Sequence, residues 1–301
     1  MISTRKISKE FEMLSIIVCT RNRPELLGRC LEALAGQKGA FEVLVVDQGD
    51  TPALIPSDPR FHYIAHQERG LAAARNKGVR AASGNIIAFL DDDAVPDPGY
   101  IGAIEQAFAG DVKLAAIAGR ILTIEDGRPY ARVHDDRPRP ITRSDWMPFL
   151  GGNFAIRRSV VNRIGPFDER FGAGRRWASG EETDYFFRML YRNCQVAYVP
   201  AIVIHHPKEA VDGAAPELRR KLFAYGRGQG AMMARHLIDF ANYRMIATLI
   251  WSVTKPGLRV MQYTLNLKRA KALLHAAVVL GKCAGFGEFI HGTAHARRNR
   301  W

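Results

Sequence analysis

The 301-residue sequence predicts an α/β fold, with a mostly parallel β-sheet flanked by helices and a helical C-terminal extension. Strand-like apolar runs alternate with helix-like stretches through about the first two hundred residues, and the last ninety read as helices. The first three strand-like runs also end at polar or acidic residues. Because parallel neighbours need a crossover between them, this rhythm places helices on both faces of the sheet.

The first elements are the clearest part of the pattern. Residues 14–19 are predicted to form a buried strand, and Pro24 begins a helix whose leucines and cysteine keep helical spacing. A second strand is expected over residues 41–46. An Ala-rich helix over 71–82 and a third strand over 86–90 follow.

The later elements are less regular. Helices are expected from Pro98 to about residue 108 and over 181–192. Strands are expected over 114–117, 151–156 and 196–199. Residues 125–145 are rich in Arg, Pro and Asp and lack periodicity, so they are predicted to form a loop. Beyond residue 211 we expect helices with breaks at residues 226–230 and 255–257, where Gly and Pro gather.

Cysteine and apolar patterning indicate a cytoplasmic protein. The first apolar run, residues 14–19, is too short for a signal peptide. No uninterrupted apolar run approaches the roughly 18 residues of a membrane span. The four cysteines are far apart and form no Cys-x-x-Cys pair, which is typical of reduced thiols.

Charge is concentrated in the C-terminal third. Residues 211–301 hold 15 Lys and Arg against 4 Asp and Glu, whereas the first 210 residues hold 28 against 26. A basic segment favours phosphates, either of nucleic acid or of anionic lipid. Aromatic residues are not interleaved with these basic residues as stacking platforms would be, so no nucleic acid is expected as a partner.

Polar groups follow the first three strands, at residues 20–22, 47–50 and 91–93. Turn chemistry could explain one such end, because Asp and Asn favour turns, but it explains all three less well. In open α/β sheets, ligands bind beyond the carboxyl ends of the strands. Three adjacent carboxylates, Asp91-Asp92-Asp93, repel one another unless a cation lies among them. Mn²⁺ or Mg²⁺, shared with a substrate diphosphate, suits such a place.

Four segments in this order resemble family 2 glycosyltransferases: residues 15–24 (SIIVCTRNRP), 42–47 (EVLVVD), 70–78 (GLAAARNKG) and 89–93 (FLDDD). The resemblance covers about residues 13–206. It implies a GT-A fold and an inverting hexosyltransferase that moves a sugar from a nucleotide diphosphate sugar, most commonly UDP-linked, to an acceptor hydroxyl. The second motif departs from the common Asp-Asn-Ser form, since Gln48-Gly49 follows Asp47.

The resemblance also implies a domain plan and donor-side residues. An N-terminal extension (1–12) precedes a catalytic domain (13–210) with a nucleotide-sugar half (about 13–110) and an acceptor half (about 111–210), and a basic helical region (211–301) follows. Nucleotide binding is assigned to Thr20, Arg21, Asp47, Arg75, Asp91 and Asp92, and metal binding to Asp91, Asp93 and His206. Arg75 could instead be a surface residue of its helix. His206 is preferred to His205, although both could be capping histidines.

On the acceptor side, residues 180–185 (GEETDY) resemble the family's Glu-Asp-x-Asp motif, whose second acid is the catalytic base. That position is Glu182, with Glu181 as the alternative. The acceptor hydroxyl must lose its proton, which requires a base, and a helix start is expected to keep Glu182 ionised. A purely structural acidic helix N-terminus would also fit. Acceptor binding is assigned to Gly151, Gly152, Asn153, Glu181 and Asp184.

The sequence leaves several interpretations of the partners and of the function open. The short apolar stretches 245–253 and 273–280 alternate with Lys and Arg, which suits a peripheral position on an anionic membrane surface, at the inner face of the plasma membrane. A helical cap with a solvated basic face is the alternative. The expected acceptor is a saccharide or lipid-linked saccharide in surface polysaccharide synthesis. A nucleotidyltransferase, a nucleic-acid- or phosphate-binding module and a non-catalytic relative are the competing functions.

Overall fold

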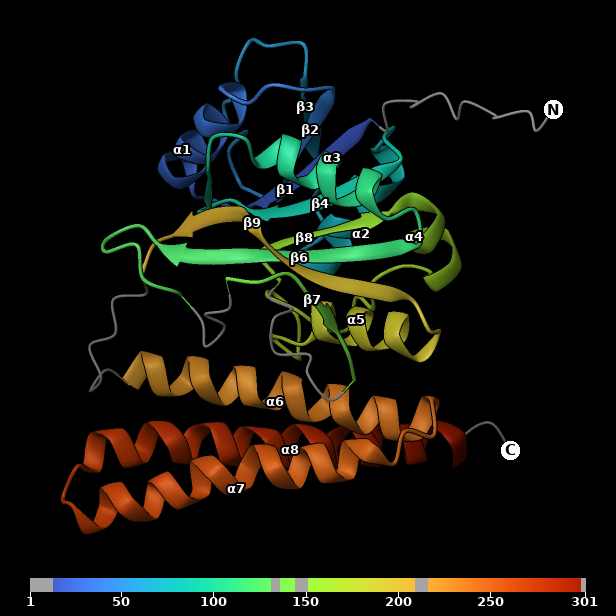
Figure 1. Cartoon of the computed structure of the whole chain (residues 1–301). Helices are drawn as coiled ribbons and strands as arrows, with labels where there is room; N and C mark the ends of the chain where they lie inside the picture. Colours follow the sequence, from blue (N-terminus) through green and yellow to red (C-terminus); the bar gives the residue numbers. More distant parts are fainter. Residues whose placement is uncertain (1–12, 131–135, 144–150, 209–215, 299–301) are drawn as a thin grey trace. The chain divides into compact units, whose positions relative to one another are not determined.

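The computed structural model describes residues 13–130, 136–143, 151–208 and 216–298. The chain divides into two compact units (Figure 1). The first, called here the sheet unit, comprises residues 1–67, 77–165 and 189–207, and the second, the helical unit, comprises 68–76, 166–188 and 208–301. This grouping differs from a linear boundary at residue 210, because two segments of the expected catalytic domain group with the C-terminal helices.

Within the described residues, the sheet unit is built on one nine-stranded sheet with the order β3-β2-β1-β4-β8-β6-β9-β5, and β7 pairs with β9 (Figure 1). Strands β3, β2, β1 and β4 are parallel, and β6 and β9 are parallel, whereas β8, β5 and β7 run against their neighbours. The strands are β1 (Leu14–Thr20), β2 (Phe41–Asp47), β3 (Phe61–Ala65), β4 (Ile86–Asp91), β5 (Val95–Pro96), β6 (Leu114–Thr123), β7 (Arg139–Ile141), β8 (Asn153–Arg157) and β9 (Gln195–His206). The predicted mostly parallel sheet is confirmed.

Helices α1 (Pro24–Ala35) and α3 (Tyr100–Gly110) share one core with alternate residues of β1, β2 and β4. Leu14, Ile16 and Val18 of β1 belong to this core, as the period of two in a strand requires. The register places Thr20 beside Asp47, and Cys19 beside Asp91. The ends of β1, β2 and β4 therefore meet at one edge of the sheet, as predicted.

Four elements were not predicted. β3 is mostly solvent-exposed and carries little apolar pattern, and β5 has only two residues. The short helix α4 (Arg158–Ile164) follows β8 directly. β7 lies inside the expected loop 125–145, because Ile141 is buried where β7 pairs with β9. Strand β8 begins two residues later than expected. The helices α2 (Leu71–Ala81) and α5 (Glu181–Tyr191) lie close to their predicted positions.

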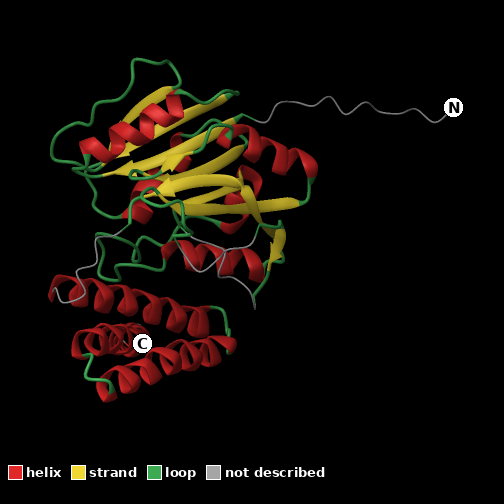
Figure 2. Cartoon of the chain, turned by 60° about the vertical axis from the view of Figure 1, so that its left-hand side comes forward, coloured by secondary structure: helices red, strands yellow, loops and turns green. Residues whose placement is uncertain are grey.

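The C-terminal region forms three helices, α6 (Pro216–Asp239), α7 (Arg244–Leu265) and α8 (Arg269–Arg298), which lie side by side in both views (Figures 1 and 2). The predicted breaks at 226–230 and 255–257 are wrong, because α6 and α7 continue through them. The glycines let two backbones approach: a Cβ at Gly226 would lie 2.6 Å from the carbonyl oxygen of Val278. By length and composition alone, one described segment, Arg269–Thr293, could cross a membrane, although its apolar run is interrupted.

Pro256 lies inside α7 and has no N–H to donate to the carbonyl of Ser252, four residues earlier. Lys282 of α8 supplies the missing donor, with its Nζ 3.2 Å from that oxygen. The Lys282 side chain is almost fully buried, and burial lowers the pKa of its amine. A long-range contact thus satisfies the carbonyl that the proline leaves unpaired, which is why α7 continues.

We therefore expect Lys282→Met to cost about 1 kcal/mol more in the wild-type background than in the Pro256→Ala background. In that second background the helix itself provides an N–H for Ser252. A double-mutant cycle measured by urea unfolding of the full chain tests this. Lys271→Met, at an exposed position of α8, is the matched control and should show no coupling to Pro256. Equal costs of Lys282→Met in both backgrounds would contradict the explanation.

Candidate functional site

At the end of β2, the buried carboxylate of Asp47 shapes the following loop. It accepts hydrogen bonds from the backbone N–H groups of Gly49 (2.7 Å) and Ala53 (2.8 Å) and from the Tyr63 hydroxyl (3.2 Å). A Cβ at Gly49 would lie 2.9 Å from both Asp47 Oδ1 and Asn22 Oδ1. A serine at this position, as in the family's Asp-Asn-Ser form, would require these side-chain oxygens to shift.

The three carboxylates after β4 have different partners. Asp92 is buried and accepts hydrogen bonds from the Thr20 hydroxyl at 2.8 Å and from Arg23 Nη1 at 3.1 Å. Asp93 contacts Arg23 Nη1 at 3.3 Å and His206 Nε2 at 3.0 Å. Asp91 lies against Gly152, where a Cβ would approach within 2.5 Å of Asp91 Oδ2. Asp92 and Thr20 thus tie β4 to β1, whereas Asp91 and Asp93 join a different cluster.

That cluster consists of Asp91, Asp93 and His206, whose ligand atoms all lie within 4.8 Å of one another. His206 ends β9, and its Nδ1 donates to the carbonyl of Pro207 at 2.8 Å. The ring of Tyr130 packs against the imidazole, with centroids 4.5 Å apart. His205 points elsewhere and contacts Asp97 at 2.7 Å. The structure therefore brings His206, rather than His205, to the acidic pair.

The donor set of this cluster fits a divalent metal. Carboxylate oxygens suit Mn²⁺ and Mg²⁺, and a neutral imidazole is a common metal ligand. The bond from Nδ1 to Pro207 leaves Nε2 as the nitrogen that faces Asp93, an arrangement typical of ligating histidines. Burial alone would lower the pKa of His206, but Asp93 outweighs it and raises that pKa.

The structure also bears on Arg21 and Thr20, which were assigned to the donor, and on Asn153, which was assigned to the acceptor. Arg21 is exposed, as a ligand-facing side chain can be. The Thr20 hydroxyl is already engaged with Asp92. Asn153 is a correction: its side chain is fully buried and bonds the carbonyls of Arg120 (2.9 Å) and Ile202 (3.0 Å). It joins β8 to β6 and β9 and leaves no surface for an acceptor, and Gly152, which precedes it, lies beside Asp91.

In the helical unit, Arg75 is not a surface residue of its helix. Its side chain is 4% exposed, and Nη1 lies 3.0 Å from Oε1 of Glu181, which is 5% exposed. The guanidinium also lies over the ring of Phe167, 5.8 Å from its centroid. Glu181 is therefore half of a buried ion pair, and this pair fixes the first residue of α5.

Glu182 follows in the first turn of α5 and remains partly exposed. Burial of its carboxyl group and the negative charge of Glu181 raise its pKa to about 8, although Arg75 acts in the opposite direction. This differs from the expectation that the helix start keeps Glu182 ionised, because burial of the carboxyl group, followed by the negative charge of Glu181, outweighs the helix N-terminus. A carboxyl group poised near neutral pH has the property of a general base.

Asp184, assigned to the acceptor from sequence, is also a correction. Its carboxylate is fully buried and is bonded by Arg188 Nε (3.0 Å), His236 Nε2 (2.9 Å) and Arg235 Nη1. Burial alone would raise its pKa, but these partners lower it to about 2. Asp184 therefore anchors α5 to α6 and has no surface with which to contact an acceptor.

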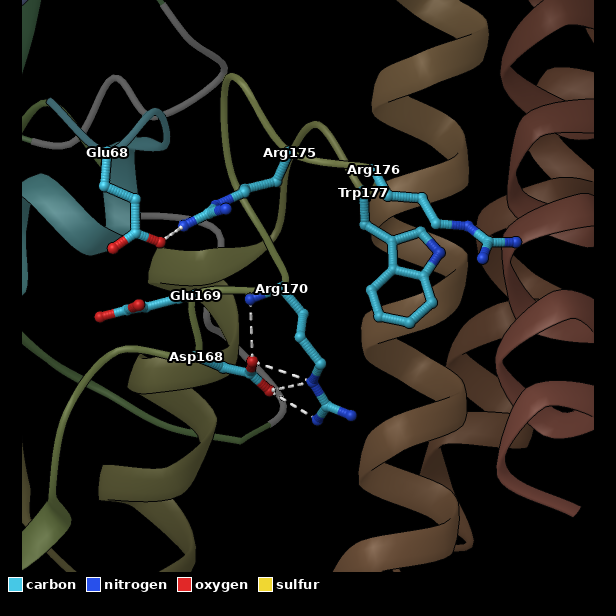
Figure 3. Close-up of a pocket in the computed structure, with 7 residues that line it drawn as sticks. All are labelled: Glu68, Asp168, Glu169, Arg170, Arg175, Arg176 and Trp177. Atoms are coloured by element: carbon cyan, nitrogen blue, oxygen red, sulfur yellow. Dashed lines mark hydrogen bonds and ion pairs between the residues drawn. The ribbon is translucent and has the colours of Figure 1, made fainter. Parts of the chain in front are cut away.

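An open hollow of about 620 Å³ lies in the helical unit (Figure 3). Its charged groups are paired: Arg170 with Asp168 at 2.7 Å, Arg175 with Glu68, and Arg176 with Glu288 at 3.0 Å. Trp177 contributes an aromatic wall that stacks on Phe171, with centroids 5.1 Å apart. The hollow is lined by Glu68, Asp168, Glu169, Arg170, Arg175, Arg176 and Trp177. It thus combines ion-paired side chains with an aromatic wall.

Sequence reasoning missed Arg23, Tyr130 and His236. Arg23 lies in the segment 15–24, just after β1, and contacts the carboxylates that follow β4. Its position at the ends of these strands could have identified it as a site residue. Burial alone would lower the pKa of Arg23. The charges of Asp92 and Asp93 outweigh the effect of burial and raise the pKa of Arg23. Tyr130 and His236 carry no local signal, because one lies in an aperiodic segment and the other is 52 residues from Asp184.

Comparison with known proteins gives a family match over residues 15–167, to the model described as Glycosyl transferase family 2. A pre-mycofactocin glycosyltransferase of Mycobacterium tuberculosis is 27% identical over 241 residues, covering 74% of this chain and 48% of the relative. The glycosyltransferase AglE of Haloferax volcanii is 25% identical over 79% of both chains. The chain spans about half the length of the first of these relatives.

A solved structure of the mannosyltransferase PcManGT from Pyrobaculum calidifontis, in complex with GDP-Man and Mn²⁺, has a TM-score of 0.56. It is 16% identical, and the match covers 90% of this chain and 86% of that one. This likeness confirms the GT-A-type fold expected from sequence. None of these matches favours the nucleotidyltransferase or nucleic-acid-binding alternatives.

Proposed function

The chain belongs to glycosyl transferase family 2, and we propose that it is a metal-dependent, inverting glycosyltransferase that moves a sugar from a nucleotide diphosphate sugar to an acceptor hydroxyl. The observation that carries this proposal is the cluster of Asp91, Asp93 and His206 beside the edge where β1, β2 and β4 end. Ligand sites of α/β sheets lie at such an edge.

On the donor side, Asp91, Asp93 and His206 are proposed to hold Mn²⁺ or Mg²⁺. The metal would neutralise the developing charge of the leaving nucleoside diphosphate. Arg23 joins Asp92 to Asp93 and thereby orients the Asp93 carboxylate. Asp47 and Gly49 shape the loop after β2, whose polar groups are proposed to contact the nucleotide base, together with Arg21. A UDP-linked donor is the proposed class.

On the acceptor side, Glu182 is proposed to take the proton of the attacking hydroxyl. Its raised pKa supports this role, because a base works best near the pH at which the enzyme operates. Arg75 acts on it indirectly by holding Glu181, and Asp184 joins the same helix to α6 through Arg235 and His236. Arg75 is therefore proposed as a positioning residue for α5 rather than as a contact to the nucleotide.

The hollow beside Trp177 is proposed to bind the acceptor saccharide. Its lining pairs every Arg with a carboxylate, so it offers planar hydrogen-bonding groups without a net charge that would favour phosphate. The loop that forms the hollow also contacts α5, the helix that carries Glu182, since a Cβ at Gly172 would lie 3.0 Å from Glu181 Cδ. We propose a saccharide or lipid-linked saccharide as acceptor and a cytoplasmic site of action.

A screen of nucleotide sugars tests the proposal. The full chain is incubated with UDP-, GDP- and dTDP-sugars in Mn²⁺, and release of the nucleoside diphosphate is measured along with thermal stabilisation. We expect one donor base to raise the melting temperature in Mn²⁺ and to lose this effect in EDTA, because the metal joins protein and diphosphate. Stabilisation by no sugar nucleotide, or by bulk DNA instead, would contradict the proposed function.

A further inference from the structure

Among the residues that the structure describes, none covers one apolar face of helix α7. Its large exposed apolar side chains recur at intervals of three, four or eight residues, which keep them on one helical face. Ile250 is 58% exposed and Leu265 is 76% exposed, and beside them Trp251 is 63% exposed. The opposite side of the helix turns inward, where Met245 is buried. The exposed residues, called here the α7 row, are Tyr243, Ile246, Ile250, Leu258, Met261 and Leu265.

The surroundings of this row carry charge of one sign. Residues 240–287 contain seven Lys and Arg and no Asp or Glu. By helical periodicity, Arg244, two turns before Trp251, and Lys255, one turn after it, lie at one edge of the row, and Arg259 lies next to them. An apolar strip with a basic edge is the pattern of a helix that lies in a membrane interface.

We propose that the α7 row binds the surface of an anionic lipid bilayer, with α7 lying parallel to the membrane plane. The apolar side chains would enter the boundary between headgroups and acyl chains, with Trp251 at headgroup level. Arg244, Lys255 and Arg259 would meet the lipid phosphates. This inference rests on the surface of the helical unit and is independent of the reaction that the chain catalyses.

The same observations disfavour other occupants. A second copy paired through this face by a two-fold axis would bring basic edges without any acidic partner close together. Nucleic acid would satisfy the basic residues but would leave the apolar row in water. A spanning arrangement of α8 would have to release its contact with α6, where a Cβ at Gly226 would already lie 2.6 Å from a carbonyl of α8.

Vesicle co-sedimentation of the full chain tests the inference. The probes are vesicles of phosphatidylcholine alone and vesicles with about 30% phosphatidylglycerol. We expect binding to the anionic vesicles that weakens as salt rises above about 0.1 M, because surface attraction is screened. The triple variant Ile250→Ser/Trp251→Ser/Leu258→Ser should bind at least about tenfold more weakly, since these side chains supply the buried apolar area.

The matched control is Leu54→Ser/Val112→Ser, which removes apolar side chains of the sheet unit that are 92% and 80% exposed. It should bind vesicles like the wild type. Arg244→Gln/Lys255→Gln/Arg259→Gln should lose the preference for anionic lipid. Melting curves of all variants check that they fold.

Four results would overturn the inference: no binding to anionic vesicles, equal binding to neutral ones, undiminished binding of the apolar triple variant, or resistance of the bound chain to alkaline carbonate, which would indicate a spanning segment. A dimer in sedimentation equilibrium that the triple variant dissociates would also overturn it, because the row would then be an interface between copies.

Discussion

Glu182→Gln is expected to lower turnover by a factor on the order of 10²–10⁴, the usual contribution of a positioned general base. Glutamine keeps the size and hydrogen-bonding capacity of the side chain but cannot accept the proton of the acceptor hydroxyl. Binding of the donor nucleotide should change little, and isothermal titration with the nucleoside diphosphate and Mn²⁺ measures this. A loss of turnover without a loss of nucleotide affinity is the signature of a missing base.

The pH dependence follows from the same group. Because burial and Glu181 raise the pKa of Glu182 to about 8, its basic form increases as the pH rises through that value. The kcat/KM of the wild type should therefore rise between about pH 7 and 9, since this parameter reports the free enzyme. The rise should be absent from the residual activity of Glu182→Gln.

The variant Glu181→Gln distinguishes the role of Glu181 from that of Glu182. It leaves the guanidinium of Arg75 buried without its ion-pair partner, which typically costs about 3–5 kcal/mol. We expect a clear fall in melting temperature for Glu181→Gln and none for Glu182→Gln. If Glu182→Gln retains near-normal turnover while a folded Glu181→Gln loses it, the base is Glu181. If both retain turnover, the inverting mechanism itself is wrong.

The strand ends could be predicted from sequence because their signal is local. Continuous apolar runs that stop at Thr20, Asp47 and Asp91 mark both the strands and the edge where they finish. Parallel pairing then requires these ends to meet, and the register of Thr20 with Asp47 confirms it. Nothing beyond short-range pattern and the crossover rule was needed.

The choice between His205 and His206 depends on structure that no short segment encodes. Successive residues of a strand point to opposite faces, so one histidine meets Asp93 and the other meets Asp97. Which one does so depends on the pairing of β9 with β6 and β5. Sequence reasoning could narrow the histidine ligand of the proposed metal site to His205 or His206. Only the register of β9 decides between these two residues.

Asp184 and the glycines of α6 show the same limit in the helical unit. An acidic residue in the first turn of a helix fits both a ligand site and a helix-dipole role. Two of the partners that bury Asp184, Arg235 and His236, lie about fifty residues away. The glycines at 226–230 lower local helix propensity, yet Gly226 and Gly230 pack closely against α8 and Gly228 against Ser179. Tertiary contacts override local preference in both cases.

Asp93→Asn is expected to weaken Mn²⁺ binding by tenfold or more, and to lower turnover by a factor on the order of 10²–10³, because it removes a charged ligand from the proposed metal site. Asp92→Asn is the matched control, one residue away. Asp92 bonds Thr20 and Arg23 and does not belong to the cluster of ligand atoms. It should lower the melting temperature, since a buried hydrogen-bonded carboxylate is lost, and leave Mn²⁺ binding close to that of the wild type.

Electron paramagnetic resonance of free Mn²⁺, titrated with the full chain in the absence of nucleotide, measures binding without relying on activity. His206→Gln should weaken binding in the same titration, whereas His205→Gln should not, because His205 contacts Asp97 instead. Equal losses for Asp92→Asn and Asp93→Asn would place the ion elsewhere in the acidic triplet. Full turnover in excess EDTA would exclude the metal from the reaction, and the cluster would then be an ion pair between His206 and Asp93 that only joins β9 to the end of β4.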